Sequence, residues 1–116
     1  MKYLNEKDII AMKLLHYFIT EENYSPVVLH GAKDEIWLEN MNNDYKIVRI
    51  VSNYIHNNEQ LDFDIFKTKR IVKNIKKKTL NVNMNVLSIF IDLGDNVTLH
   101  KEKNIDLVYL EDEKDI

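Results

Sequence analysis

The chain has 116 residues, of which 45% are hydrophobic and 30% charged, a balance typical of one globular domain. It contains no cysteine, which excludes disulfides and thiolate metal sites. No apolar run approaches the roughly 20 residues that a membrane-spanning helix needs. The formal net charge is only -3, but the charges are unevenly distributed along the chain. We therefore expect one α/β domain over residues 1–110, followed at 111–116 by the start of a linker or a further helix.

The first predicted element is an amphipathic helix over residues 6–22. Asn5 can cap its N-terminus, with Asp8 as the partner three residues later in a capping box. Apolar side chains at helical spacing predict the buried face. They are Ile9, Met12, Leu15 (or His16) and Ile19, with Leu14 and Phe18 beside them. Pro26 then suits the start of a strand, because proline has no N–H to donate to a ladder.

Three short strands are predicted next, over residues 27–30, 35–39 and 45–51. The second and third strands have apolar residues at consecutive positions, which indicates burial on both faces. We therefore expect layers that cover both sides of the sheet.

The segment between the second and third strands is predicted to form a tight hairpin turn, because it contains adjacent asparagines and Asn tolerates positive φ. This turn would place Glu39 opposite Lys46 and Trp37 opposite Val48, two favourable cross-strand pairs. Trp37 is the only tryptophan, and we expect it to anchor the core. A hot spot for a protein partner is the alternative role.

A second helix is predicted from residue 61 to about residue 79. Asp62 can cap it, and Leu61 can pack on Phe66 as a hydrophobic staple. The apolar stripe of this helix is narrow. It consists of Ile65, Val72 and Ile75, with Phe66 and Ile71 at the edges.

Two further apolar segments complete the fold. Residues 85–92 are predicted to form a central strand, and residues 105–110 can form a fifth strand at an edge. The fold class is therefore α/β (α+β), with the order α-β-β-β-α-β and an extra strand at the end. A helical crossover gives a mixed sheet covered by helices. This order of elements is that of restriction-endonuclease-like folds.

The active sites of such folds need an acid on the second strand and an Asp/Glu-x-Lys on the third, which converge on Mg²⁺. The candidates are Asp34 or Glu35 and the tripeptide Asp44-Tyr45-Lys46. In a tight hairpin Glu35 falls opposite Ile50 or Arg49, whereas Asp44 lies at the turn, roughly 17–20 Å away. Carboxylates that far apart cannot share a metal ion, so we expect no nuclease site.

The sequence contains no nucleophile elbow, no glycine-rich phosphate loop and no paired-histidine zinc motif. We therefore expect no catalytic residue, no cofactor and no enzymatic activity of this chain. Candidate metal ligands, which lack any ligand spacing, are His16, His30, Glu35 and Glu39. The alternative is that these histidines are ordinary surface or hydrogen-bonded core residues.

The most basic segment lies in the second predicted helix, where seven cations occur within twelve residues and no acid is among them. They are Lys67, Lys69, Arg70, Lys73, Lys76, Lys77 and Lys78. Three interpretations are open: a solvated helix face, a surface for anionic lipid headgroups, or phosphate contacts with a nucleic acid. The negative net charge and the absence of aromatic residues between the cations disfavour nucleic acid.

Five segments of the chain together resemble the soluble N-terminal domain that precedes the membrane-embedded domain in rhomboid-family intramembrane serine proteases of Gram-positive bacteria. They are residues 12–18, 34–40, 45–50, 61–63 and 85–90. The most specific part is Glu35-Ile36-Trp37-Leu38-Glu39 followed by Val48-Arg49-Ile50. The resemblance extends over residues 8–92.

The resemblance implies a non-catalytic accessory or regulatory domain on the cytoplasmic side of the membrane, joined by a linker to a transmembrane protease core. The catalytic Ser of that family, in a Gly-x-Ser-Gly motif, and its His lie in the core, so neither is carried over to this chain. The implied partners are the rest of the same polypeptide and an anionic membrane surface. The alternative is a free-standing binding module for anionic polymers, either a membrane surface or a nucleic acid, that uses residues 67–78.

Overall fold

The computed structural model describes residues 5–29, 35–78 and 83–112 of the chain. Its elements follow the predicted order, and the extra strand at the end is formed. They are α1 (Glu6–Thr20), β1 (Ser25–Val27), β2 (Glu35–Glu39), β3 (Ile47–Val51), α2 (Asn58–Lys78), β4 (Val86–Phe90) and β5 (Ile105–Tyr109). The predicted α+β class is therefore confirmed. Of the segment 111–116, only residues 111 and 112 are described, and they are not helical.

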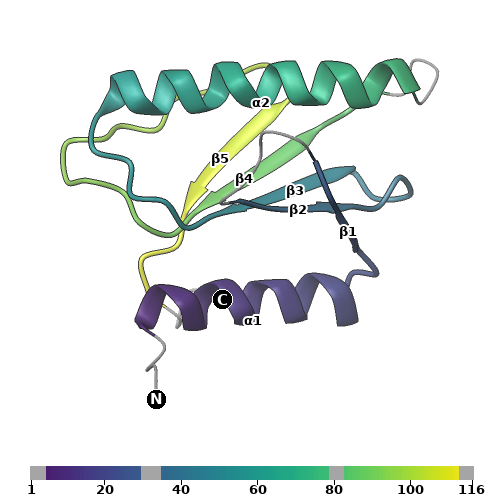
Figure 1. The fold of residues 1–116 in the computed structure, drawn as a ribbon, viewed down its shortest axis with the longest axis horizontal. Helices are drawn as coiled ribbons and strands as arrows, with labels where there is room; N and C mark the ends of the chain where they lie inside the picture. The colour runs from purple at the N-terminus through teal and green to yellow at the C-terminus, as the bar shows by residue number, and fades with distance from the viewer. Residues whose placement is uncertain (1–4, 30–34, 79–82, 113–116) are drawn as a thin grey trace.

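The five strands form one mixed sheet in the order β1-β2-β3-β4-β5. The neighbouring pairs β1–β2 and β2–β3 are antiparallel, whereas the pairs β3–β4 and β4–β5 are parallel. As Figure 1 shows, α2 covers one face of the sheet and α1 lies on the other. β4 is internal and β5 forms an edge, as predicted. The prediction of layers on both sides of the sheet is also confirmed.

Two hydrophobic cores fill the spaces between these layers. The core beneath α2 includes Trp37, Val51, Leu61, Ile65, Val86 and Phe90. The core beneath α1 includes Ile10, Leu14, Leu38, Val48 and Ile89. Trp37 is only 2% exposed, which confirms its predicted role as a core anchor.

Asn5 caps the start of α1, Glu21 caps its end, and Asn23 lies in the turn that follows. The Asn5 side chain accepts a hydrogen bond of 2.8 Å from the Asp8 N–H, which confirms the predicted N-cap. Asn23 adopts the left-handed conformation with φ of 60°, and the chain turns there toward β1. β1 is shorter than predicted and lies earlier in the sequence. Pro26 lies in the middle of this edge strand, where a missing N–H is tolerated.

The buried face of α1 differs from the predicted one. Ile10, Ala11 and Leu14 are buried against the sheet, whereas Met12 is 56% exposed and Ile19 is exposed as well. The prediction was correct for Leu14, which is buried, and for Leu15 and Phe18, which pack against the core, but wrong for Met12 and Ile19. The apolar residues near the start of the helix form two overlapping stripes, rotated by about one residue. Periodicity alone does not choose between the stripes, and contact with the sheet does.

The register of the β2–β3 hairpin also differs from the prediction. Trp37 pairs with Arg49 and Glu39 pairs with Ile47, so both predicted pairs were wrong by one residue along β3. A shift of one residue moves every side chain of a strand to the other face of the sheet. The observed register therefore places Arg49 on the same face as Trp37, beneath α2.

The reason for this register is the loop before β3, which is longer than the predicted tight turn. It is closed by a hydrogen bond of 3.0 Å from the Asn40 N–H to the Lys46 carbonyl. The Asn40 side chain donates to the carbonyls of Glu22 and Asn23, in the turn that follows α1. A tertiary contact with another segment therefore helps to set the loop.

α2 begins three residues earlier than predicted. The Asn57 side chain accepts a hydrogen bond of 2.9 Å from the Gln60 N–H and so acts as the N-cap, which corrects the assignment to Asp62. Leu61 is completely buried, whereas Phe66 is 58% exposed. The predicted staple between Leu61 and Phe66 was therefore wrong, because these side chains point to opposite sides of the helix.

Candidate functional site

The most distinctive surface of the molecule is the side of α2 that faces away from the sheet (Figure 1). Residues spaced three or four apart along α2 form one line on this side. We call this line the outer stripe, and it consists of Phe63, Phe66, Arg70, Lys73 and Lys77. Phe63 is 68% exposed and Phe66 is 58% exposed. The three cations of the outer stripe are exposed too.

The sequence shows no acid among the cations of residues 67–78. In the structure, however, two of these cations form ion pairs. Lys67 forms an ion pair of 3.2 Å with Glu35, and Lys69 forms one of 2.7 Å with Glu102. Both acids lie far from α2 in the sequence, so a charge count along the helix could not identify them. These two lysines are therefore partly neutralised.

The cations of the outer stripe differ from Lys67 and Lys69 in their contacts. Arg70 lies over the ring of Phe66, with 5.9 Å between its guanidinium carbon and the ring centroid. Lys73 and Lys77 form no ion pair within 4 Å with an acid among the described residues. The side chain of Lys78 lies outside the described residues. The outer stripe therefore combines exposed aromatic rings with cations that are available to an external anion.

A groove adjoins this stripe, between α2 and the first residues of β4 and β5. We call it the lysine groove, and its volume is about 360 Å³. Its lining residues are Lys69, Val72, Lys73, Lys76, Met84, Val86, Lys103, Asn104 and Ile105. Four lysines thus surround an apolar base. The three of these that lie on α2 belong to the predicted basic segment, whereas Lys103 comes from the turn before β5.

A buried ion cluster, which the sequence did not predict, lies on the same side of the sheet. The Arg49 guanidinium donates to both carboxylate oxygens of Asp64, at 2.8 and 3.1 Å, and also to the Glu35 carboxylate. It donates to the Ser88 hydroxyl at 3.1 Å. Arg49 is completely buried. A charged residue between apolar neighbours in β3 was the only signal of this cluster.

The electrostatic effects on Glu35 oppose one another. Burial favours the neutral acid, but the charge and hydrogen bond of Arg49, together with Lys67, outweigh burial and hold the pKa of Glu35 below its usual value. The carboxylate is therefore ionised and fully engaged by cations. Because the cluster is closed to solvent, we assign it a role in stability rather than in catalysis.

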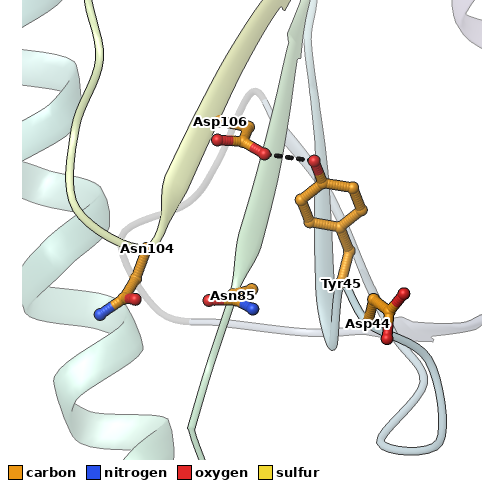
Figure 2. Close-up of a pocket in the computed structure, with 5 residues that line it drawn as sticks. All are labelled: Asp44, Tyr45, Asn85, Asn104 and Asp106. Carbon is orange, nitrogen blue, oxygen red and sulfur yellow. Dashed lines mark hydrogen bonds between the residues drawn. The ribbon is translucent and has the colours of Figure 1, made fainter.

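Figure 2 shows a second pocket, at the end of the sheet where β3, β4 and β5 begin. Its volume is about 340 Å³, and it is lined by Asp44, Tyr45, Asn85, Asn104 and Asp106. The Tyr45 hydroxyl donates a hydrogen bond to Asp106, the largest of the effects that raise the pKa of Tyr45. This bond connects the loop before β3 to β5.

Of the candidate nuclease acids, Asp34 lies outside the described residues, and Glu35 and Asp44 lie at opposite ends of the hairpin. Glu35 pairs with Val51, not with Ile50 or Arg49 as predicted. Asp44 lies before the start of β3 and lines the polar pocket. Glu35 and Asp44 therefore do not converge.

The candidate metal ligands do not converge either. His16 is exposed on α1, whereas Glu35 contacts Arg49 on the opposite side of the sheet. Glu39 is half-buried on β2. His30 lies outside the described residues. In the described parts of the chain, no three His, Asp or Glu side chains are grouped so that they could hold a metal ion.

Fold and surface together define an α+β domain with a five-stranded mixed sheet and a helix whose outer side is both basic and aromatic. A scan against protein-family models finds no match, and a search of curated proteins finds none. Within residues 5–29, 35–78 and 83–112, no helix is both long and apolar enough to cross a membrane.

Proposed function

We propose that this chain is a non-catalytic accessory domain of a rhomboid-like intramembrane serine protease, and that it binds an anionic membrane surface through the outer stripe. The link to the protease rests on the sequence resemblance. The membrane binding rests on one observation: Phe63 and Phe66 are exposed on the same helix face as Arg70, Lys73 and Lys77. Such a face is typical of helices that lie in the lipid headgroup layer.

Rough magnitudes support this proposal. Each cation near an anionic leaflet contributes about 1 kcal/mol. Complete burial of a phenylalanine side chain contributes about 1.5–3 kcal/mol, and partial insertion contributes a fraction of this. The sum corresponds to weak binding by a free domain. A domain joined to a transmembrane protease would gain from its high local concentration at the bilayer.

The second candidate is a free-standing module that binds single-stranded nucleic acid. Phe66 beside Arg70 favours it, because exposed aromatic rings stack on bases and cations contact phosphates. The net charge of -3 opposes it. Fluorescence polarisation with labelled single-stranded oligonucleotides distinguishes the two candidates, since the proposed membrane domain should bind them only weakly.

Co-sedimentation with vesicles tests the membrane proposal. We expect binding to phosphatidylglycerol-containing vesicles that falls steeply with salt, and little binding to pure phosphatidylcholine. Arg70→Glu/Lys73→Glu should weaken binding at least about tenfold, because each lost cation contributes about 1 kcal/mol. The matched control is Lys13→Glu/Lys101→Glu, which reverses two exposed lysines outside α2.

The contribution of the aromatic rings is tested separately. Phe63→Ser/Phe66→Ser should weaken vesicle binding, whereas Met12→Ser/Ile19→Ser, which changes two exposed apolar residues of α1, should not. Equal losses from both pairs would contradict the proposal, and so would equal binding to neutral vesicles. For the protease part, the reading frame that encodes this chain should continue into several apolar segments, one with Gly-x-Ser-Gly. A stop codon directly after Ile116 would refute that part.

A further inference from the structure

We infer that the lysine groove binds the headgroup of a lipid that ends in a phosphate monoester. This inference rests on the proposed membrane binding, because the groove lies beside the outer stripe and Lys73 belongs to both. It goes further by assigning a saturable site for one class of lipid. The argument depends on the charge of the groove, its apolar base and its rigidity.

The charge of the groove favours an anion. Lys69, Lys73 and Lys76 line it from α2, and Lys103 lines it from the turn before β5. Glu102 partly neutralises Lys69. Lys73 and Lys103 form no ion pair with an acid among the described residues. At least two positive charges therefore face a space that contains no carboxylate in its lining.

A phosphate monoester fits this charge. Its second pKa is near 6, so it carries between one and two negative charges at neutral pH, and its three free oxygens accept strong hydrogen bonds. Each lysine ammonium offers three donors. A phosphodiester headgroup carries only one charge and would leave one of the cations uncompensated.

The base of the groove indicates a lipid rather than a free phosphate ion. Met84, Val86 and Ile105 close the groove from beneath, and each is at most 4% exposed, so only small parts of these apolar side chains reach the groove. Val72 adds a half-buried wall on the α2 side. A volume of about 360 Å³ accommodates a headgroup and the first carbons of a lipid, whereas inorganic phosphate would leave the apolar part unused.

The groove is held in shape by the sheet. Asn104 adopts the left-handed conformation with φ of 66°, and its carbonyl accepts a hydrogen bond of 2.8 Å from the Val86 N–H. This contact fixes the turn that carries Lys103 against the first residue of β4. The cations across the groove are therefore supported by α2 on one side and by the sheet on the other, which limits the ordering that a ligand must impose.

The experiment is an NMR titration of the intact domain with dihexanoyl phosphatidic acid at concentrations below micelle formation. We expect saturable amide shifts confined to Val72, Met84, Asn104, Ile105 and their neighbours. Dihexanoyl phosphatidylcholine and inorganic phosphate should each bind at least about tenfold more weakly. Equal binding of phosphatidylcholine would overturn the inference, and so would equal binding of inorganic phosphate or the absence of any saturable shift.

Two variants separate this site from the vesicle-binding stripe. Lys103→Glu should weaken the affinity for dihexanoyl phosphatidic acid at least about tenfold while leaving binding to phosphatidylglycerol vesicles nearly unchanged. Lys101→Glu, two residues away and exposed, is the matched control and should affect neither. Phe63→Ser/Phe66→Ser should lose vesicle binding but keep the soluble lipid. A Lys103→Glu variant with unchanged affinity for the soluble lipid would refute lipid binding in the lysine groove, whatever the result of the vesicle-binding assay.

Discussion

At the scale of single residues, Arg49 shows how a charged side chain is accommodated in the core. Among the described residues it is the largest side chain that is fully buried, and its guanidinium lies 5.3 Å from the centroid of the Trp37 ring. Burial of a charge is costly unless charged partners compensate it. Glu35 and Asp64 provide this compensation from β2 and α2, so the cluster joins the helix to the sheet.

Removal of Arg49 should therefore leave two buried carboxylates without their cation. We expect Arg49→Ala to lower the free energy of unfolding by about 3–5 kcal/mol, as measured by urea denaturation. Arg49→Lys keeps the charge but loses the two-pronged contact with Asp64, so its loss should be smaller. A loss below about 1 kcal/mol for Arg49→Ala would show that the cluster does not support the fold.

The lowered pKa of Glu35 predicts a pH dependence. A carboxyl group whose pKa is lower in the folded state stabilises the fold above its unfolded pKa, here the ordinary value of 4.5, and loses this contribution as pH falls through the folded pKa. The free energy of unfolding should therefore decrease below pH 4.5. Glu35→Gln should reduce this dependence of the free energy of unfolding on pH, as measured by denaturation curves recorded at several pH values. Glu59→Gln, at an exposed position of α2, is the control. An unchanged pH dependence in Glu35→Gln would contradict the assignment.

At the scale of elements, α2 has two different faces. Leu61, Ile65 and Thr68 are buried against the sheet, whereas Phe63 and Phe66 are exposed to solvent. Exposed aromatic residues do not stabilise the packed helix, which is why their position suggests a role in binding. The start of α2 depends on neither face but on the side chain of Asn57, which caps the helix.

The observed start of α2 is tested by two alanine substitutions. Asn57→Ala should lower the free energy of unfolding by about 1 kcal/mol, because it removes the acceptor for the Gln60 N–H. Asp62→Ala lies within the helix and is exposed, so it should change stability by less than about 0.5 kcal/mol. Thermal denaturation of both variants gives the comparison. The reverse order would restore the helix start that the sequence suggested.

At the scale of the whole molecule, the two helices lie on opposite faces of the sheet (Figure 1). Only α2 carries the outer stripe and borders the lysine groove. The domain as a whole has a net charge of -3, so its attraction to an anionic surface must depend on orientation. The side that carries α2 should face the bilayer, and α1 should face away.

This orientation is measurable with a paramagnetic lipid in anionic vesicles or nanodiscs. Amide signals of residues 63–77 should broaden when the domain is bound, whereas those of α1 should remain sharp. α1 is a stringent internal control, because its exposed Met12 also presents apolar surface that could contact lipid. Broadening of α1 alone would reverse the proposed orientation.

The sequence by itself determined the features that depend on neighbouring residues. The order of helices and strands, the Asn5 cap and the bounds of β2 follow from hydrophobic periodicity, turn residues and local hydrogen bonds, and the structure confirms them. The basic segment was also visible, since its cations are close together in the chain. These signals are local, so one sequence carries them without knowledge of the fold.

Only the tertiary structure decided which side chains face each other across elements. The pairing of Arg49 with Trp37 depends on a loop that is held by the turn after α1, and a slip of one residue would turn Arg49 to the other face. The exposure of Phe66 depends on how α2 rotates against the sheet. Lys103 joins the lysines of α2 because β5 lies beside β4. These arrangements arise from long-range packing. Alternative faces of an element differ little in contact free energy, and the contacts of the whole core decide between them.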